Sequence, residues 1–214
     1  MKILVACEYS GAVRDEFAKK GHYAMSCDLL PTDTEGNHYQ GDVEDVLYDD
    51  WDMIIAFPPC THLAISGAIH FEKKKADGRQ QQGIDFFNLF TEKNEKLKCE
   101  KVVIENPVGI MSNEYREPDQ IIHPFYFGDE ASKKTCLWLK GVNPLIHFPD
   151  DDLFNEKTWV SPGEFHEWVN KKTGEKKKQP KWYADSFFSD RDNAGHLRSK
   201  TFPAIARAMA DQWG

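Results

Sequence analysis

The sequence has no pair of closely spaced cysteines. It lacks any C-x-x-C arrangement, and its histidines supply no short metal-binding spacing either. Structural zinc sites need such pairs, and an odd number of cysteines, five, does not indicate a disulfide framework. A chain of 214 residues can bury roughly 70% of the surface that its unfolded form exposes, so it folds without them. We therefore expect one domain without a metal, in a reducing compartment. The cysteines are Cys7, Cys27, Cys60, Cys99 and Cys136.

Long apolar runs are also missing. No stretch approaches the roughly 20 apolar residues that span a bilayer. Residues 2–6 already have a strand pattern, without the charged region and apolar run of a signal peptide. These patterns predict a cytoplasmic protein with no membrane partner.

Positive charge is in deficit. The chain has 27 Lys and Arg residues against 35 Asp and Glu residues, which gives a net charge of -8. Proteins that read nucleic acids usually carry a basic domain. A polyanionic partner would therefore have to meet a local basic patch on an acidic body.

Strand and helix patterns alternate in the first half of the chain. Continuous apolar runs are typical of strands buried on both faces, and their alternation with helical patterns predicts an α/β fold. We expect a mostly parallel sheet with helices on both faces. The predicted strands are 2–6, 23–27, 52–57 and 101–105, and the predicted helices lie near 13–20 and 80–97.

The chain after about residue 125 has little periodicity. Within it, the stretch from Trp168 to Trp182 predicts a β-hairpin, because Gly174 lies in a turn between two extended arms. Its lysines and tryptophans could contact phosphate and stack on bases, although a charge run is equally well explained as a solvated face. Residues 201–213 have a helical pattern.

The segments that follow the predicted strands are the places to look for chemistry, because ligands bind outside the carboxyl ends of parallel strands. Gly11 follows the first strand and Asp28 ends the second, an arrangement that can seat a nucleoside. The full G-x-G-x-x-G pattern is absent, which favours a cofactor without phosphates, such as S-adenosylmethionine, over NAD. An ordinary glycine turn would explain Gly11 equally well. Asp42 could accept a hydrogen bond from an adenine amino group, but Gly41-Asp42 also reads as a surface turn.

Two further segments carry candidate catalytic groups. Pro58 and Pro59 stiffen the loop that presents Cys60, so its thiol is a candidate nucleophile, although a buried apolar role is the usual one for cysteine. Glu105 follows an apolar strand, where burial would raise its pKa toward the range of a general acid. A solvated glutamate is the alternative.

These segments resemble the motifs of the cytosine carbon-5 methyltransferases. Residues 52–67, DMIIAFPPCTHLAISG, resemble the Pro-Cys loop of that family, and Glu105-Asn106-Pro107-Val108 is similar to its Glu-Asn-Val element. The motifs follow one another in the family's order, and residues 199–213 resemble its C-terminal segment. Small methyltransferase-like proteins of phages and prophages are also similar.

The resemblance implies a Rossmann-like fold of the S-adenosylmethionine-dependent methyltransferases with a small hairpin insertion. Residues 1–145 and 195–214 would form the catalytic domain, and 146–194 a minimal target-recognition insertion. It further implies that the Cys60 thiolate adds to carbon-6 of a flipped-out cytosine in DNA while Glu105 protonates ring nitrogen 3. Carbon-5 then takes the methyl group of S-adenosylmethionine.

Residue roles also follow from the resemblance. The family's glycine-rich first loop is reduced here to Gly11, and its arginine-rich motif is replaced by Ser132-Lys133-Lys134-Thr135. The contact near the target base therefore falls to Lys133 or to Lys134, which we expect to be catalytic with Cys60 and Glu105. Cofactor contacts are expected from Cys7, Glu8, Tyr9, Ser10, Gly11, Asp28, Leu29, Asp42, Val43, Pro58 and Thr201. DNA contacts are expected from Lys133, Lys171, Lys172, Lys176, Lys177 and Lys178.

Other functions stay open at this point. The acidic balance and the short recognition region favour the same chemistry on RNA or on a free pyrimidine nucleotide. The reduced first loop favours a catalytically reduced S-adenosylmethionine binder with a regulatory or counter-defence role. A NAD-binding module is the weakest alternative, because the glycines are missing.

Overall fold

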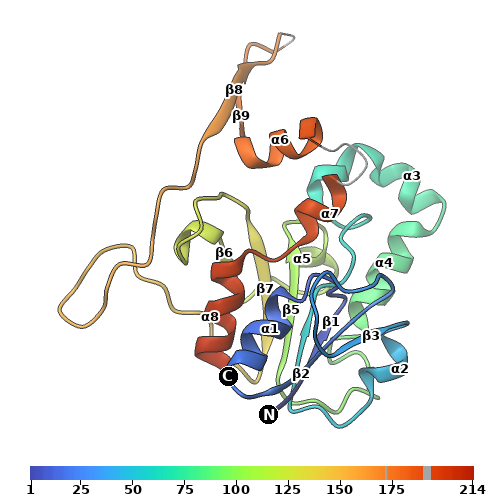
Figure 1. The fold of residues 1–214 in the computed structure, drawn as a ribbon. Coiled ribbons are helices and arrows are strands. Elements are labelled where there is room, and N and C mark those ends of the chain that lie inside the picture. The colour runs from blue at the N-terminus through green and yellow to red at the C-terminus, as the bar shows by residue number, and fades with distance from the viewer. Residues whose placement is uncertain (172, 190–193) are drawn as a thin grey trace.

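A seven-stranded sheet forms the centre of the molecule (Figure 1). The computed structural model describes residues 1–171, 173–189 and 194–214. The strand order is β3-β2-β1-β4-β5-β7-β6. β1 to β5 pair in parallel, whereas β7 runs antiparallel to both of its neighbours. The strands are β1 (Lys2–Ala6), β2 (Tyr23–Asp28), β3 (His38–Gln40), β4 (Met53–Ala56), β5 (Val102–Pro107), β6 (Gln120–Ile122) and β7 (Thr135–Lys140).

Helices cover both faces of this sheet. The side chains of β1 alternate between two cores: Ile3 and Val5 pack toward α1 and α8, whereas Leu4 and Ala6 pack toward α4. Each face thus buries its own apolar set. The helices are α1 (Ala12–Lys19), α2 (Glu44–Leu47), η1 (Ile65–His70), α3 (Phe71–Ala76), α4 (Arg79–Asn88), α5 (Met111–Glu114), η2 (Pro124–Tyr126), α6 (Lys181–Ser189), α7 (Ala194–Ser199) and α8 (Pro203–Trp213).

The predicted α/β class and mostly parallel sheet are confirmed, and so are the four predicted strands. The sequence pattern does not reveal β7, which lies in the stretch of little periodicity after residue 125 and pairs with both β5 and β6, with Trp138 fully buried. The predicted crossover helix is also shorter than expected, since α4 ends at Asn88. β3 and β6 are too short to show an alternating pattern, which explains why the sequence does not reveal them.

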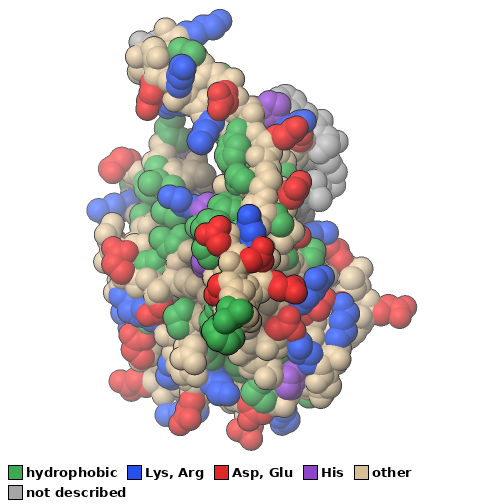
Figure 2. All heavy atoms as spheres, turned by 90° about the vertical axis from the view of Figure 1, so that its left-hand side faces the viewer, with side chains coloured by type: hydrophobic (Ala, Val, Ile, Leu, Met, Phe, Trp, Pro, Cys, Tyr) green, Lys and Arg blue, Asp and Glu red, His purple; other side chains and the backbone are tan. Residues whose placement is uncertain are grey.

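The predicted hairpin is present as β8 (Phe165–Val169) and β9 (Lys176–Pro180), with Gly174 at a φ of 71° in the turn. It projects from the body of the molecule (Figure 1). Figure 2 shows both basic and acidic side chains on this projection, as on the body below it. Trp182 was expected to add a stacking surface to the hairpin. It lies instead in α6, where its Nε1 donates to the Ser132 carbonyl at 3.3 Å.

No helix of the described ranges is both long and apolar enough to cross a membrane.

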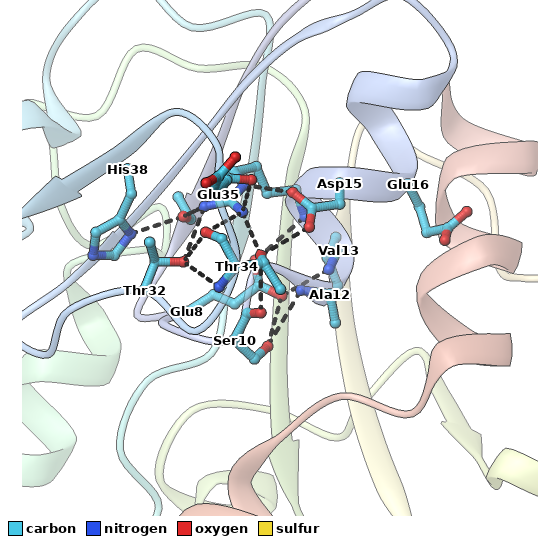
Figure 3. Close-up of polar contacts among 12 residues, drawn as sticks. Glu8, Ser10, Ala12, Val13, Asp15, Glu16, Thr32, Thr34, Glu35 and His38 are labelled. Atoms are coloured by element: carbon cyan, nitrogen blue, oxygen red, sulfur yellow. Dashed lines mark hydrogen bonds and ion pairs between the residues drawn. The ribbon is translucent and has the colours of Figure 1, made fainter.

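A buried arginine, Arg14, holds α1 and the segment after β2 together. Figure 3 shows Asp15 of α1 beside Thr34 of that segment. Arg14 is 1% exposed. Its Nε donates to Asp15 at 2.7 Å, and its two terminal nitrogens reach Ser26 and the loop 32–35. The acceptors on that loop are the Thr32 and Thr34 hydroxyls and the Thr34 and Glu35 carbonyls. The guanidinium group therefore fastens this loop to the start of α1.

Gly11 fits under this loop because it has no side chain. Its φ of 74° lies in the left-handed region, and a Cβ added there would stand 2.3 Å from the Thr34 hydroxyl oxygen. Close packing of the loop on α1 thus explains why residue 11 is a glycine, without any ligand. Gly11 therefore gives no support to the cofactor hypothesis, which has to rest on other residues.

We expect Arg14→Leu to lower the free energy of unfolding by about 3 kcal/mol, because Asp15 and several buried acceptors lose their donor. Chemical denaturation of the variant and the wild type measures this difference. Arg79→Leu is the matched control, since Arg79 also pairs with an aspartate, Asp77, but on the surface. It should change stability little. Equal effects of the two substitutions would contradict the structural role of Arg14.

Candidate functional site

The carboxyl ends of β1, β2, β4 and β5 meet at one edge of the sheet. Ala6 is in register with Cys27 on one side and with Ala56 on the other, and Ala56 is in register with Ile104. The strand order reverses at β1, because β2 and β3 follow on one side and β4 and β5 on the other. In open α/β sheets this reversal marks the ligand site. The predicted post-strand segments therefore lie side by side, as the sequence analysis expects.

The half of the site at β1 and β2 is acidic. Burial, together with the negative charges of Asp28 and Asp42, raises the pKa of the Cys7 thiol. The same two carboxylates add to the burial that raises the pKa of Cys27 to about 12. Both aspartates therefore lie near the end of β1, where a negative potential disfavours phosphates and favours a cationic ligand.

The other residues expected to contact a cofactor differ in how far they are exposed at this edge of the sheet. Leu29 is 73% exposed beside Asp28, whereas Val43 is 5% exposed and belongs to the core. The Tyr9 carbonyl accepts a hydrogen bond from the Asp33 amide at 3.0 Å, which joins the first loop to the segment after β2. Thr201 follows Lys200, whose Nζ is paired with Asp33 at 2.7 Å.

Glu8 faces α1 and is 4% exposed (Figure 3). Its carboxylate accepts the Val13 amide at 2.7 Å, the Arg14 amide at 3.3 Å and the Ser10 hydroxyl at 3.3 Å. Glu8 thus satisfies amides of the first turn of α1, which otherwise lack partners. Burial raises its pKa to about 7, against the opposing effect of these hydrogen bonds and of Arg14. Glu8 therefore supports the start of α1, and its buried carboxylate has little surface accessible to a ligand.

The loop that carries Cys60 is held by the end of β5. The Nδ2 of Asn106 donates to the Pro58 carbonyl at 2.7 Å, and Asn106 is 1% exposed. Gly109 passes so close to this loop that an added Cβ would stand 2.2 Å from the Leu63 carbonyl oxygen. The loop closes on itself because the amides of Leu63 and Ala64 donate to the Cys60 carbonyl, each at 2.9 Å. The backbone at Cys60 is therefore held close to β5.

The charge of Glu105 acts on the Cys60 thiol. It lies within β5 rather than after it, and burial raises its pKa, opposed by the charge of Lys133 and a hydrogen bond from Thr135. Burial and the Glu105 carboxylate raise the pKa of Cys60, whereas the charges of Lys133 and Arg198 lower it. A thiol, a carboxyl group with a raised pKa and the charges of Lys133 and Arg198 thus influence one another electrostatically.

Lys133 and Lys134 are placed differently. Lys133 is half-buried, and its Nζ donates to the Arg198 carbonyl at 3.2 Å, close enough for its charge to act on Cys60 and Glu105. Lys134 is exposed and acts on His123 and Cys136 instead. The structure therefore places Lys133, not Lys134, at the two candidate catalytic groups. Nothing in the sequence distinguishes these adjacent lysines.

Of the lysines expected to contact DNA, Lys133 lies at this site, whereas the other described ones lie on the hairpin. Lys171, Lys176, Lys177 and Lys178 are exposed on the hairpin, whereas Lys172 lies outside the described residues. Lys178 is positioned over the Phe165 ring at 4.9 Å from its centroid.

The roles of Asn106, Arg14 and Arg198 do not emerge from sequence reasoning. The signal for Asn106 was present, because it lies inside the Glu-Asn-Pro element. Arg14 lies between the apolar positions Val13 and Phe17 of a short helix, and a charged residue there hints at burial. Arg198 has no such signal. Among the described residues there is no cluster of three or more histidine, cysteine, aspartate or glutamate side chains that could hold a metal ion.

Comparisons with known proteins complete this description. No family model matches the chain, and no curated protein matches it. Among solved structures, it is similar to a chain described as a candidate DNA modification methyltransferase encoded within a prophage of E. coli. The two are 14% identical, and the match covers 92% of this chain and 69% of the other with a TM-score of 0.46. We draw no functional conclusion from a likeness of this size.

The pKa of Glu8 predicts a pH-dependent stability. Its folded-state pKa of about 7 lies above the ordinary value of 4.5, so the folded state binds the extra proton between these values. The free energy of unfolding therefore falls as the pH rises through this window, by up to about 3 kcal/mol from this group. Glu8→Gln removes the titrating group. Unfolding free energies of both proteins between pH 4.5 and 8 should diverge across the window, and parallel curves would contradict the assignment.

Proposed function

We propose that this protein transfers a methyl group from S-adenosylmethionine to carbon-5 of cytosine in DNA, with Cys60 as the nucleophile and Glu105 as the acid. The observation that supports this most is the shared electrostatic environment of the Cys60 thiol, in the loop after β4, and the Glu105 carboxyl group of β5. Covalent activation of a pyrimidine needs these two groups at the same ring.

The acidic half of the site fits the cofactor. S-adenosylmethionine supplies a methyl group on a cationic sulfur when it is bound. The carboxylates of Asp28 and Asp42 add negative charge at the end of β1, where they contribute, after burial, to the raised pKa of Cys7. They suit the sulfonium and amino groups and disfavour a pyrophosphate, as in NAD. Asp28 would accept hydrogen bonds from the ribose hydroxyls, and the exposed Leu29 beside it would cover one face of the adenine.

The proposed reaction needs a protonated Glu105 and a deprotonated Cys60 at the same time. Protonated Glu105 donates to ring nitrogen 3 while the Cys60 thiolate bonds to carbon-6, and carbon-5 then accepts the methyl group. Loss of the carbon-5 proton to solvent lets the carbon–sulfur bond break, and Glu105 takes back the proton from nitrogen 3. The buried Glu105 is suited to start protonated, and its neutral form no longer repels a thiolate at Cys60.

The polymer substrate would be held by the insertion 146–194. Its hairpin projects from an acidic body and carries exposed lysines (Figure 2). Lysines in this setting bind phosphate groups as point charges, with little selectivity for sequence.

Methyl transfer to unmodified genomic DNA with radiolabelled S-adenosylmethionine at low salt tests the activity. We expect label in the DNA, its loss in Cys60→Ser and a rate at least about 100-fold lower in Glu105→Gln, which cannot supply the proton. Cys99→Ser is the control, because Cys99 is a buried cysteine whose thiol donates to the Lys101 carbonyl, at the start of β5. Cofactor binding without any labelled DNA would overturn the proposed substrate. Label on RNA or on free deoxycytidylate would show which substrate replaces it.

The hairpin predicts a salt-dependent affinity. We expect Lys176→Ala/Lys177→Ala to weaken binding of duplex DNA and to flatten the dependence of log affinity on log salt by about 0.9 per lost phosphate contact. Fluorescence anisotropy at several salt concentrations measures both. The matched control is Lys96→Ala/Lys98→Ala, which removes two exposed lysines that precede β5 at the opposite edge of the sheet. If both pairs weaken binding equally, the hairpin has no special role.

A further inference from the structure

A loop between β7 and β8 presents two adjacent apolar side chains to solvent. We call residues 149–157 the tip loop; its Leu153 and Phe154 are 89% and 88% exposed. The loop projects from the body of the molecule (Figure 1). Single exposed apolar residues are common on protein surfaces, whereas neighbouring ones on a projection are typical of a contact surface.

The tip loop is held at its base and at its end. At the base, the Phe148 amide donates to the Thr158 hydroxyl and the Thr158 amide to the Phe148 carbonyl, each at 2.9 Å. The Thr158 hydroxyl in turn donates to the Tyr126 carbonyl at 2.7 Å. At the end, the Phe154 amide donates to the Asp152 carboxylate at 2.7 Å. The loop is thus ordered before it meets a partner, which lowers the entropic cost of binding.

The charge of the tip loop limits what can bind it. The loop contains four acidic residues and one lysine, which gives a net charge of 1 - 4 = -3. This charge disfavours DNA and anionic membranes, because both present phosphate groups. A fitting partner combines apolar side chains with positive charge. The acidic residues are Asp150, Asp151, Asp152 and Glu156.

The hairpin of β8 and β9 has these two properties. Residues 165–180 contain five lysines and two glutamates, so the net charge is 5 - 2 = +3. Trp168 and Val169 are exposed on β8, and they lie directly opposite Lys177 and Lys176 of β9. Directly opposite residues of two paired strands share a face. Each exposed apolar side chain of the hairpin therefore has a lysine beside it.

We propose that the tip loop of one copy of this protein binds the hairpin of a second copy, and that a twofold dimer forms this contact twice. The contact within one chain is not made, since Leu153, Phe154 and Trp168 all stay exposed. Between two copies, the apolar side chains pack on one another and the opposite charges adjoin. A contact of so few residues is small, so the dimer is weak and reversible.

The dimer covers the hairpin lysines that are proposed to bind DNA. Self-association and DNA binding therefore exclude each other. This consequence rests on the proposed function, whereas the self-association itself does not.

Sedimentation velocity at low salt and about 100 µM protein, a concentration suited to a weak contact, tests the dimer. We expect a reversible dimer in the wild type and a dissociation constant more than about tenfold higher in Leu153→Ser/Phe154→Ser, which removes the apolar contact. Ile69→Ser is the matched control, because Ile69 is equally exposed but lies on η1. A monomeric wild type would overturn the proposal, and so would a dimer that the tip substitutions leave unchanged.

Exchange of charges between the two surfaces tests which of them meet. Asp150→Lys/Glu156→Lys makes the tip loop positive, and Lys176→Glu/Lys177→Glu makes the hairpin negative. Each variant alone should be monomeric, because one surface then repels its counterpart on an identical copy. Mixed in equal amounts, the two variants should form a dimer, since both contacts again join opposite charges. Fluorescent labelling of one variant detects the mixed dimer, and a mixture that stays monomeric would overturn the proposal.

Duplex DNA added to the wild type tests the consequence for binding. We expect it to convert the dimer into complexes of DNA with one copy of the protein. A dimer that persists on bound DNA would overturn the mutual exclusion.

The sedimentation of the protein alone needs neither DNA nor cofactor. A dimer that obeys the charge exchange supports this inference even in a protein that labels no DNA. A monomeric wild type that labels DNA would reject the inference and leave the proposed function standing.

Discussion

The parallel pairing of β1, β2, β4 and β5 brings the ends of four strands to one edge of the sheet, and the candidate site exists because of it. Residues far apart in the chain, such as Asp28 and Glu105, reach this edge through their strand register alone. Two polar contacts then set the finer geometry. Arg14 fixes the segment after β2 against α1, and Asn106 fixes the loop before Cys60 against β5. Each lies inside the protein, where a hydrogen bond is costly to lose.

The charges divide this edge into two chemically different halves. Asp28 and Asp42 make the end of β1 negative, while Lys133 and Arg198 bring positive charge to Cys60. An acidic protein can in this way present positive charge to one thiol. The same division suits the proposed reaction, in which a cationic methyl donor would meet an anionic nucleophile.

The first loop combines stability and strain in a small volume. Glu8 and Arg14 are both buried, and each is compensated by several hydrogen bonds. Cys7 has a φ of 60°, an uncommon value for a residue with a side chain. Burial of Glu8 still raises its pKa, so the loop is held together at some cost in stability at neutral pH. In return for this loss of stability, the loop at the end of β1 is held in a fixed position.

The α/β class, the four long strands, α1, α8 and the hairpin could be predicted from the sequence, because apolar period and turn residues are local signals. The motif residues Cys60, Glu105 and Asp28 could likewise be named from their place after apolar runs. Only the tertiary structure decided that Lys133 turns inward whereas Lys134 is exposed, that Trp182 leaves the hairpin for α6, and that the Arg198 guanidinium group lies over the Tyr183 ring. These outcomes depend on long-range packing of the last third of the chain. Lys133 and Lys134 are adjacent residues of the same type, so no local signal in the sequence distinguishes one from the other.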